Sequence, residues 1–201
     1  MTSSVLSTAS GTAQGGRRRR ATAPGVSIRP GVAGDAEALA AIYGWHVLNG
    51  TGTFEIEPPG GADMLARRDA VLADGWPWLV AEQGGAVVGF ACAGPFRPRP
   101  AYRFCLEDSI YLHPDAQRQG IGRVLLAELI ARCRALGARQ MLAVIGDSAN
   151  AGSIGLHRAL GFAPVGLLVG VGRKFDRWID VVLMQRALGA GSAADPADTL
   201  P

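Results

Sequence analysis

The sequence predicts a mixed α/β fold in which helices flank one central sheet, antiparallel in its N-terminal part and holding a parallel pair further along. Three observations predict this fold. Segments with a two-residue apolar period alternate with segments of helical period. The pair Gly84-Gly85 separates two apolar runs, as in a hairpin. The strongest helical pattern, residues 123–137, stands between two strand-like runs and predicts a right-handed crossover.

The other elements follow from periodicity and from residues that begin or end regular structure. Asp35 is placed to cap the first helix, and Gly75 is placed to end the second. Two prolines end the loop between these helices. In chain order, we expect a strand at 26–31, a helix at 36–48, a loop at 49–59, a helix at 62–75, a hairpin at 77–96, a strand at 104–114, the helix at 123–137, a strand at 140–146, a short helix at 148–162 and a closing strand at 178–188.

Composition indicates one globular domain between two tails. Residues 1–26 are rich in Ser, Thr, Gly and Ala, residues 190–201 in Gly, Ala, Asp and Pro, and neither segment has enough apolar surface to order itself. Residues 27–189 are long enough for one domain with one core. Four arginines lie in the first tail and two aspartates in the second, so the domain is nearly neutral. We therefore expect neither a nucleic-acid nor a membrane partner.

Cysteine and histidine usage points to a reduced, cytoplasmic protein without a metal site. The three cysteines have no CxxC spacing, and no signal peptide precedes them. Cys133 falls on the apolar stripe of the longest helix, which indicates packing. The three histidines lack the spacing of metal ligands.

The stretch "HPDAQRQGIGRVLLAEL" (113–129) begins the longest helix with two glycines. Because the first amides of a helix lack internal partners and carry the positive end of its dipole, bare backbone here favours an anion. Gly120 and Gly122 would let phosphate oxygens approach these amides, and Arg118 and Arg123 would add positive charge. The pattern is Q-x-x-G-x-G, neither a Walker loop nor a dinucleotide fingerprint. The alternative is a glycine-lined turn without a ligand.

Three longer stretches carry a family resemblance. "EDSIYLHPDAQRQGIGRVLLAELI", "MLAVIGDSANAGSIGLHRALGF" and "GVGRKFDRWIDVVLMQRAL" resemble the GNAT acetyltransferases, within them the branch of phosphinothricin and methionine sulfoximine N-acetyltransferases. The resemblance spans essentially residues 27–188, including "FEIEPP" and "AGPFRPRPAYRF". Relatives often carry glycine and a basic residue where this chain has Arg118 and Gln119.

The resemblance implies acetyl-CoA as co-substrate, no metal, and a likeness to homodimers. It places the pyrophosphate at the turn before the longest helix and the pantetheine arm along the preceding strand. The implied cofactor contacts are Ile110, Tyr111, Leu112, Gln117, Arg118, Gln119, Gly120, Ile121, Gly122, Arg123 and Asn150.

Acetyl transfer to an amine needs a neutral nucleophile, an oriented thioester and stabilisation of the oxyanion. The resemblance assigns the general base to Glu107, which would act with a raised pKa or through a water. His157 is the second candidate, as acid to the leaving thiol or as base, and its alternative is a buried structural histidine. An acyl-cysteine route through Cys105 is disfavoured because no neighbour in sequence would activate that thiol.

A Pro-rich loop, "PFRPRPAYRF" (95–104), offers arginines whose planar groups suit a carboxylate. The resemblance places substrate contacts at Arg97, Pro98, Arg99, Glu107, Asp108 and Ser109. Strand alternation turns Asp108 to the face opposite Glu107, so we expect it to be the weaker candidate base. Phe54 in "GTFEIEPP" is a candidate for the pocket wall or for packing.

The function expected is acetyl-CoA-dependent N-acetylation of the α-amino group of a small amino acid or analogue by direct transfer. The analogues in view are phosphinothricin, methionine sulfoximine and methionine sulfone. Two alternatives stay open: an acetyltransferase for peptide or protein N-termini or other amines such as polyamines, and a CoA-binding regulatory module without turnover.

Overall fold

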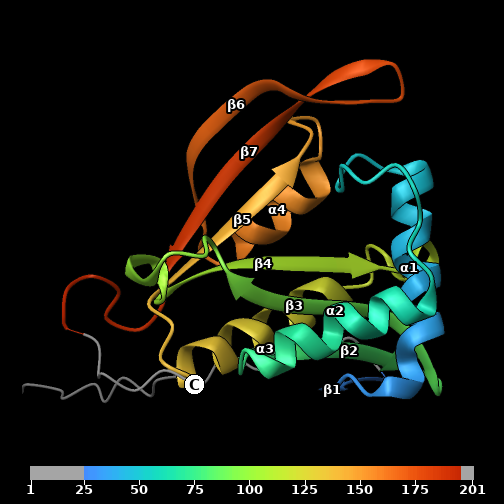
Figure 1. The fold of residues 1–201 in the computed structure, drawn as a ribbon, viewed down its shortest axis with the longest axis horizontal. Coiled ribbons are helices and arrows are strands. Elements are labelled where there is room, and N and C mark those ends of the chain that lie inside the picture. The colour runs from blue at the N-terminus through green and yellow to red at the C-terminus, as the bar shows by residue number, and fades with distance from the viewer. Residues whose placement is uncertain (1–24, 196–201) are drawn as a thin grey trace, which may run out of the picture.

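A computed structural model describes residues 25–195; residues 1–24 and 196–201, which belong to the two predicted tails, lie outside the described residues. The fold is a seven-stranded sheet with helices on both faces (Figure 1). The strand order is β1-β2-β3-β4-β5-β7-β6. The strands are β1 (Val26–Pro30), β2 (Trp78–Gln83), β3 (Ala86–Pro95), β4 (Cys105–Leu112), β5 (Gln140–Gly146), β6 (Ala163–Lys174) and β7 (Arg177–Ala187). The α-helices are α1 (Ala36–Asn49), α2 (Gly61–Ala73), α3 (Ile121–Ala135) and α4 (Ala151–Ala159).

Two cores lie on opposite faces of the sheet. α3 buries Leu125, Leu126 and Leu129 against small residues of β2 and β3, together with Met141 of β5. On the other face, α1 and α2 cover an aromatic cluster that includes Phe90 and Trp78. Residues of β4 therefore alternate between an α3 face and an α1/α2 face.

The antiparallel front and its hairpin confirm the sequence prediction. β1 to β4 pair antiparallel in chain order. Gly84 and Gly85 have φ angles of 61° and 82°. Both angles are left-handed, as a tight hairpin requires, and glycine adopts this conformation with little strain. The predicted crossover is also present, because α3 connects β4 to β5 and these two strands are parallel.

The parallel pair β4–β5 is short, and this sets the geometry of the site. The strands pair only from Cys105 with Gln140 to Asp108 with Ala143. Beyond that point β4 runs on to Leu112 and β5 to Gly146, and the two strands diverge (Figure 1). The edge of β4 that faces β5 consequently has no strand partner from Ser109 to Leu112. We call this divergence the β4–β5 split.

Two sequence predictions were wrong. The prediction omitted β6, whose residues are mostly exposed and interrupted by Gly166, Gly170 and Gly172, so neither burial nor alternation marks a strand. Asp35 makes no side-chain cap to α1. Its carboxylate instead accepts from the guanidinium of Arg29 at 2.8 and 2.9 Å and from the amide of Val32 at 2.8 Å. The Arg29 hydrogen bonds, more than any other contact, hold the pKa of Asp35 below its usual range.

Candidate active site

The turn before α3 has the geometry of an anion site. Gly120 caps the helix with φ 81°, and no other atom lies within 4 Å of a β-carbon built there, so its backbone faces open space. A β-carbon on Gly122 would lie 3.3 Å from Leu112 Cδ1 and 3.3 Å from Leu156 Cδ2. Glycine at 120 therefore leaves the backbone at the start of α3 uncovered, and glycine at 122 lets α3 pack closely against Leu112 and Leu156.

Arg118 is the unusual residue of this turn. Its φ of 60° lies in the left-handed region that favours glycine and costs another residue roughly 1–2 kcal/mol. Its neighbour Gln119 folds back, and the side-chain amide donates to the carbonyl of Asp115 at 2.6 Å. The turn thus keeps its shape without a glycine at 118.

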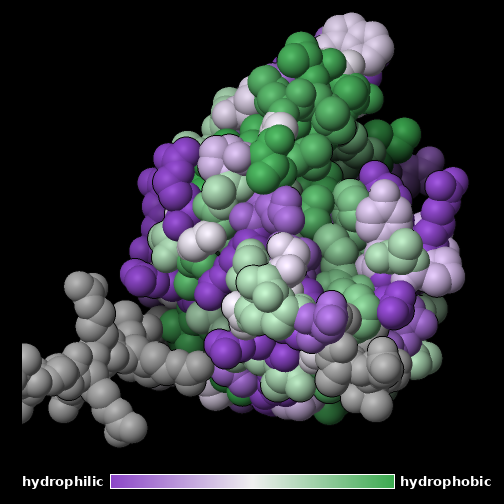
Figure 2. All heavy atoms as spheres, turned by 90° about the vertical axis from the view of Figure 1, so that its left-hand side faces the viewer, coloured by the Kyte–Doolittle hydropathy of each residue, from purple (hydrophilic) through white to green (hydrophobic). Residues whose placement is uncertain are grey.

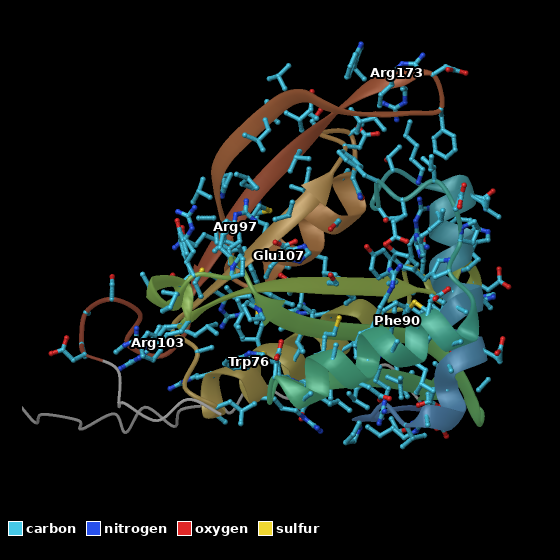
Figure 3. The ribbon with its side chains drawn as sticks, viewed as in Figure 1. Trp76, Phe90, Arg97, Arg103, Glu107 and Arg173 are labelled. Atoms are coloured by element: carbon cyan, nitrogen blue, oxygen red, sulfur yellow. The ribbon has the colours of Figure 1, made fainter. Side chains whose placement is uncertain are left out.

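Glu107 lies at the start of the split, on the α1/α2 face of β4. It is half-buried, and burial raises the pKa of its carboxyl, an effect that the charge of Arg97 partly opposes. Figure 3 shows Arg97 and Glu107 as neighbours, with Arg103 further away along the same loop. Glu107 pairs with Gly94 of β3, where a β-carbon would meet no atom within 4 Å. Open space therefore adjoins the carboxylate.

The 97–103 loop presents its arginines differently. Arg97 stacks over Phe96 with 4.3 Å from guanidinium carbon to ring centre, and Arg103 stacks over Phe104 at 4.4 Å. Arg97, Pro98 and Arg99 are all exposed. Of these, Arg97 is the one whose charge acts on Glu107.

Asp108 and His157 form a buried pair on the α3 face, away from Glu107. His157 is 2% exposed; its Nε2 lies 3.1 Å from Asp108 Oδ2, and its Nδ1 donates to the Ser153 carbonyl at 2.8 Å. Because both partners are acceptors, the ring is held between them. Burial lowers the pKa of His157, but the hydrogen bond and charge of Asp108 together raise it by more than burial lowers it. The net shift of the pKa is therefore upward. The structure does not bring either side chain to the open space beside Glu107.

The side chain of Asp108 is 1% exposed and turned toward His157, so the predicted substrate contact of Asp108 would be made by its backbone. This pairing also favours the structural alternative for His157, because both ring nitrogens are occupied within the protein. Asp108 Oδ1 is buried and has no hydrogen-bond partner among the described residues.

The last turn of α1 and residues 50–55 that follow it together bridge the ends of β4 and β5, and of residues 50–55 the sequence analysis proposed only Phe54 for the site. At the β4 end, Nε2 of His46, in the last turn of α1, lies 2.8 Å from the Leu112 carbonyl oxygen. At the β5 end, Thr51 donates to Asp147 at 3.0 Å, and the ring of Phe54 lies against Gly146 and Gly172. Phe54 is therefore a packing residue of this bridge.

Lys174 of β6 holds the bridge in place and was missed by sequence reasoning. It is 6% exposed, and its ammonium donates to the carbonyls of Gly50 at 2.8 Å and Thr53 at 2.9 Å. No local signal marks it, because the partners lie more than 120 positions away in the chain.

Asn150 caps α4 at the far side of the split. Its Oδ1 accepts from the Ser153 amide at 3.1 Å, and its Nδ2 donates to the Gly146 carbonyl at 3.4 Å. The residue thus ties the end of β5 to the start of α4.

Residues 25–195 contain neither a metal-binding cluster nor a membrane-spanning helix. No three His, Cys, Asp or Glu side chains in this range gather to hold a metal ion. Nor does this part of the chain contain a helix that is long and apolar enough to cross a membrane.

Comparison with known proteins decides the family. The profile of the Acetyltransferase (GNAT) family matches residues 41–162, a stretch that contains the split, Glu107 and the turn before α3. The chain belongs to the GNAT acetyltransferase family.

Relatives within the GNAT family are close. The chain is 54% identical over 162 residues to a phosphinothricin N-acetyltransferase from Alcaligenes faecalis, which covers 81% of this chain and 82% of the relative. It is 40% identical over 176 residues to an L-methionine sulfoximine/L-methionine sulfone acetyltransferase from Pseudomonas paraeruginosa, covering 87% and 98%.

Solved GNAT structures share the fold. A phosphinothricin acetyltransferase from Sinorhizobium meliloti, in complex with AcCoA, matches with a TM-score of 0.85 at 48% identity, covering 88% of this chain and 95% of that one. A ribosomal-protein-alanine N-acetyltransferase from Brucella melitensis matches with a TM-score of 0.78 at 41% identity, covering 81% and 99%.

Proposed function

We propose that this acetyltransferase transfers the acetyl group of acetyl-CoA to the α-amino group of a free amino acid or an analogue of the phosphinothricin, methionine sulfoximine or methionine sulfone type. The observation that carries the proposal is the juxtaposition of Glu107, with its raised pKa, and Arg97 at the start of the β4–β5 split. Glu107 would then act as base for the amine, and Arg97 would bind the carboxylate. An α-amino acid carries these two groups on one carbon, so the two side chains suit it. The names of the two curated relatives support this substrate class.

Acetyl-CoA fits the split and the turn before α3. The unpaired edge of β4, from Ile110 to Leu112, offers backbone groups to the pantetheine amides. The turn of residues 117–123 offers the first amides of α3 to the pyrophosphate, and Gly120 leaves room for the oxygens. Asn150 lines the opposite wall at the end of β5.

Glu107 prepares the amine. A carboxylate with a raised pKa accepts a proton from the ammonium group, directly or through a water, more readily than an ordinary glutamate. The neutral nitrogen then attacks the thioester carbonyl carbon, the carbon–sulfur bond breaks, and the second nitrogen proton ends on the departing sulfur. A backbone amide of β4 stabilises the oxyanion. Burial raises the pKa of Cys105, which supports direct transfer over an acyl-cysteine.

Asp108 and His157 act by position in this proposal. Asp108 is the last residue of β4 that pairs with β5, and its hydrogen bond to His157 joins that point to α4. The pair thereby fixes where the split begins. Arg97 and Arg99 hold the substrate carboxylate, with Pro98 and Ser109 beside them.

We place the acetyltransferase domain at residues 27–189 and propose a cytoplasmic homodimer. Figure 2 shows apolar side chains gathered at the top of the molecule, where β6 and β7 lie. Exposed members of this apolar face include Val165, Leu167, Val169, Val171 and Trp178. Contiguous exposed apolar surface of this kind is typical of protein interfaces, and a second copy would cover it. By contrast, Trp76 and Trp78 are core residues.

Free thiol release from acetyl-CoA tests the function. The panel contains free amino acids, the phosphinate, sulfone and sulfoximine analogues, short peptides and polyamines, with Glu107→Gln in parallel. We expect turnover on α-amino acids that falls about 100-fold or more in the variant. Acetyl-CoA binding without thiol release on any amine would favour a regulatory module instead.

A second candidate is acetylation of peptide or protein N-termini. The Brucella melitensis neighbour, titled a ribosomal-protein-alanine N-acetyltransferase, favours it. Turnover of short peptides but not of free amino acids in the same panel would select this candidate, because a peptide lacks the adjacent carboxylate that Arg97 would bind.

A further inference from the structure

A cavity of about 300 Å³ lies at the carboxyl end of α3. Arg134, in the last turn of the helix, and Arg139, just before β5, line it together with Gly189 and Ala190, which follow β7. Because α3 has 15 residues, the helix is about 22 Å long. The cavity is therefore separated by about the length of α3 from the turn that we propose for the pyrophosphate of acetyl-CoA.

The guanidinium groups at this cavity have no carboxylate partner within the described part of the chain. Arg134 makes neither an ion pair nor a hydrogen bond through its side chain there, and Arg139 donates only from Nη2, to the carbonyl of Asp195 at 2.7 Å. Most of the N–H groups of these two side chains are therefore available to a ligand.

Arg186 of β7 adds a third positive charge beside Arg134. Its guanidinium donates to the carbonyl of Leu160, at the end of α4. Burial lowers the pKa of Arg186, and the positive charge of Arg134 lowers it further. The negative ends of α3 and α4 offset only about half a charge each, so three guanidinium groups leave a clear excess of positive charge at this place.

Two backbone amides in the cavity wall are also free. The amides of Gly189 and Ala190 donate to no acceptor within residues 25–195, whereas the neighbouring amides of Leu188 and Gly191 donate to backbone carbonyls. Gly189 has a φ of 59°, and successive amides beside a left-handed residue form a concave surface that suits an anion. A β-carbon on Gly189 would lie 3.5 Å from Nε of Arg134, so these amides and that guanidinium are neighbours.

We propose that this cavity binds a small anion with at least two negative charges, carried on phosphate or carboxylate oxygens. Arg134 and Arg139 offer planar pairs of N–H donors that match two oxygens of one such group, and the amides of Gly189 and Ala190 add two more donors. The bound anion would join the end of α3 to the segment after β7 and would stabilise the folded protein as its concentration rises. Binding at this place requires no part of the proposed function.

Thermal unfolding of the full-length protein in inorganic phosphate, pyrophosphate or malonate, each compared with sodium chloride at equal ionic strength, tests the site. If phosphate binds with a Kd of about 1 mM or tighter, about 20 mM phosphate should raise the unfolding temperature by roughly 3 °C or more. Phosphate and pyrophosphate acting without malonate would assign the site to phosphoryl groups. Malonate acting alone would assign it to carboxylates.

Arg134→Gln and Arg139→Gln should each weaken phosphate binding about tenfold or more in isothermal titration calorimetry, because each removes charged hydrogen-bond donors. Arg132→Gln is the matched control, since Arg132 lies in the same turn of α3 but pairs with Glu128 at 3.1 Å, and it should bind phosphate like wild type. Saturating acetyl-CoA, which would occupy the turn before α3, should leave the phosphate effect in place. An effect that chloride reproduces, that acetyl-CoA abolishes, or that persists in the double variant of Arg134 and Arg139 would overturn the proposal.

Discussion

Replacing Lys174 by methionine tests how the bridge over the β4–β5 split is held. The ammonium of Lys174 is the donor to two carbonyls of the bridge, Gly50 O and Thr53 O. Methionine keeps most of the aliphatic stem and removes both hydrogen bonds. The bridge contains Thr51 and Phe54, which contact the end of β5. Its position therefore affects the shape of the site as well as the stability of the protein.

The expected loss of stability follows from those two bonds. A hydrogen bond from a charged donor contributes about 1.5–3 kcal/mol, and the two together about 3–6 kcal/mol. Folding of the wild type pays for burying the ammonium and for fixing the lysine side chain, and the variant avoids these costs. They offset about 2 kcal/mol of the loss. The net loss is then about 1–4 kcal/mol, which lowers the unfolding temperature of a domain of this size by roughly 2–16 °C.

Thermal unfolding followed by circular dichroism measures this shift, and Arg173→Met is the matched control. Arg173 is the neighbouring residue of β6, but it is exposed, and within residues 25–195 its ion pair is with the exposed Asp176 at 3.0 Å, a contact worth less than about 1 kcal/mol. We also expect Lys174→Met to raise KM for the amine more than KM for acetyl-CoA. Equal unfolding temperatures for the two variants would refute the role given to Lys174.

Three further predictions concern the site and the core. Because burial raises the pKa of Glu107, folding favours its protonated form, and the folded state loses stability as pH rises from the unfolded pKa to the folded one. Glu107→Gln should therefore unfold at a higher temperature than wild type at pH 7, and wild-type kcat/KM should rise with pH through the raised pKa; a variant less stable than wild type would contradict this. Gly122→Ala places a methyl group 3.3 Å from Leu112 and Leu156 and should raise KM for acetyl-CoA several-fold in steady-state assays, with kcat for the amine nearly unchanged. Leu129→Ala, in the fully buried stripe of α3, should lower the free energy of unfolding in urea by about 2–5 kcal/mol.

Local signals predicted the parts of the fold that local physics determines. The hairpin at Gly84-Gly85 requires two consecutive residues in the left-handed conformation, and a pair of glycines in the sequence indicates such a turn. The apolar stripe of α3 is likewise readable, since its leucines recur at helical spacing and are all buried. At the site, the glycine turn before α3 was visible as a backbone feature, whereas Glu107 was distinguished from a solvated edge residue only by family resemblance.

What could not be predicted depends on contacts between distant segments. β6 has no buried face to give it a period, and its pairing with β7 alone makes it a strand. The Asp108–His157 pair joins residues 49 positions apart, and only the fold shows that it turns away from Glu107. The place of Asp35 before α1 predicts a helix cap, but Arg29 on strand β1 binds its carboxylate instead.

A crystal structure of the protein with CoA and an unreactive amino acid acceptor tests the central claim most directly. We predict that the pantetheine arm lies in the β4–β5 split along Ile110 to Leu112, with the acceptor nitrogen within reach of Glu107, directly or through one water, and its carboxylate on Arg97. An acceptor nitrogen bound away from Glu107, or a pantetheine arm outside the split, would contradict the account.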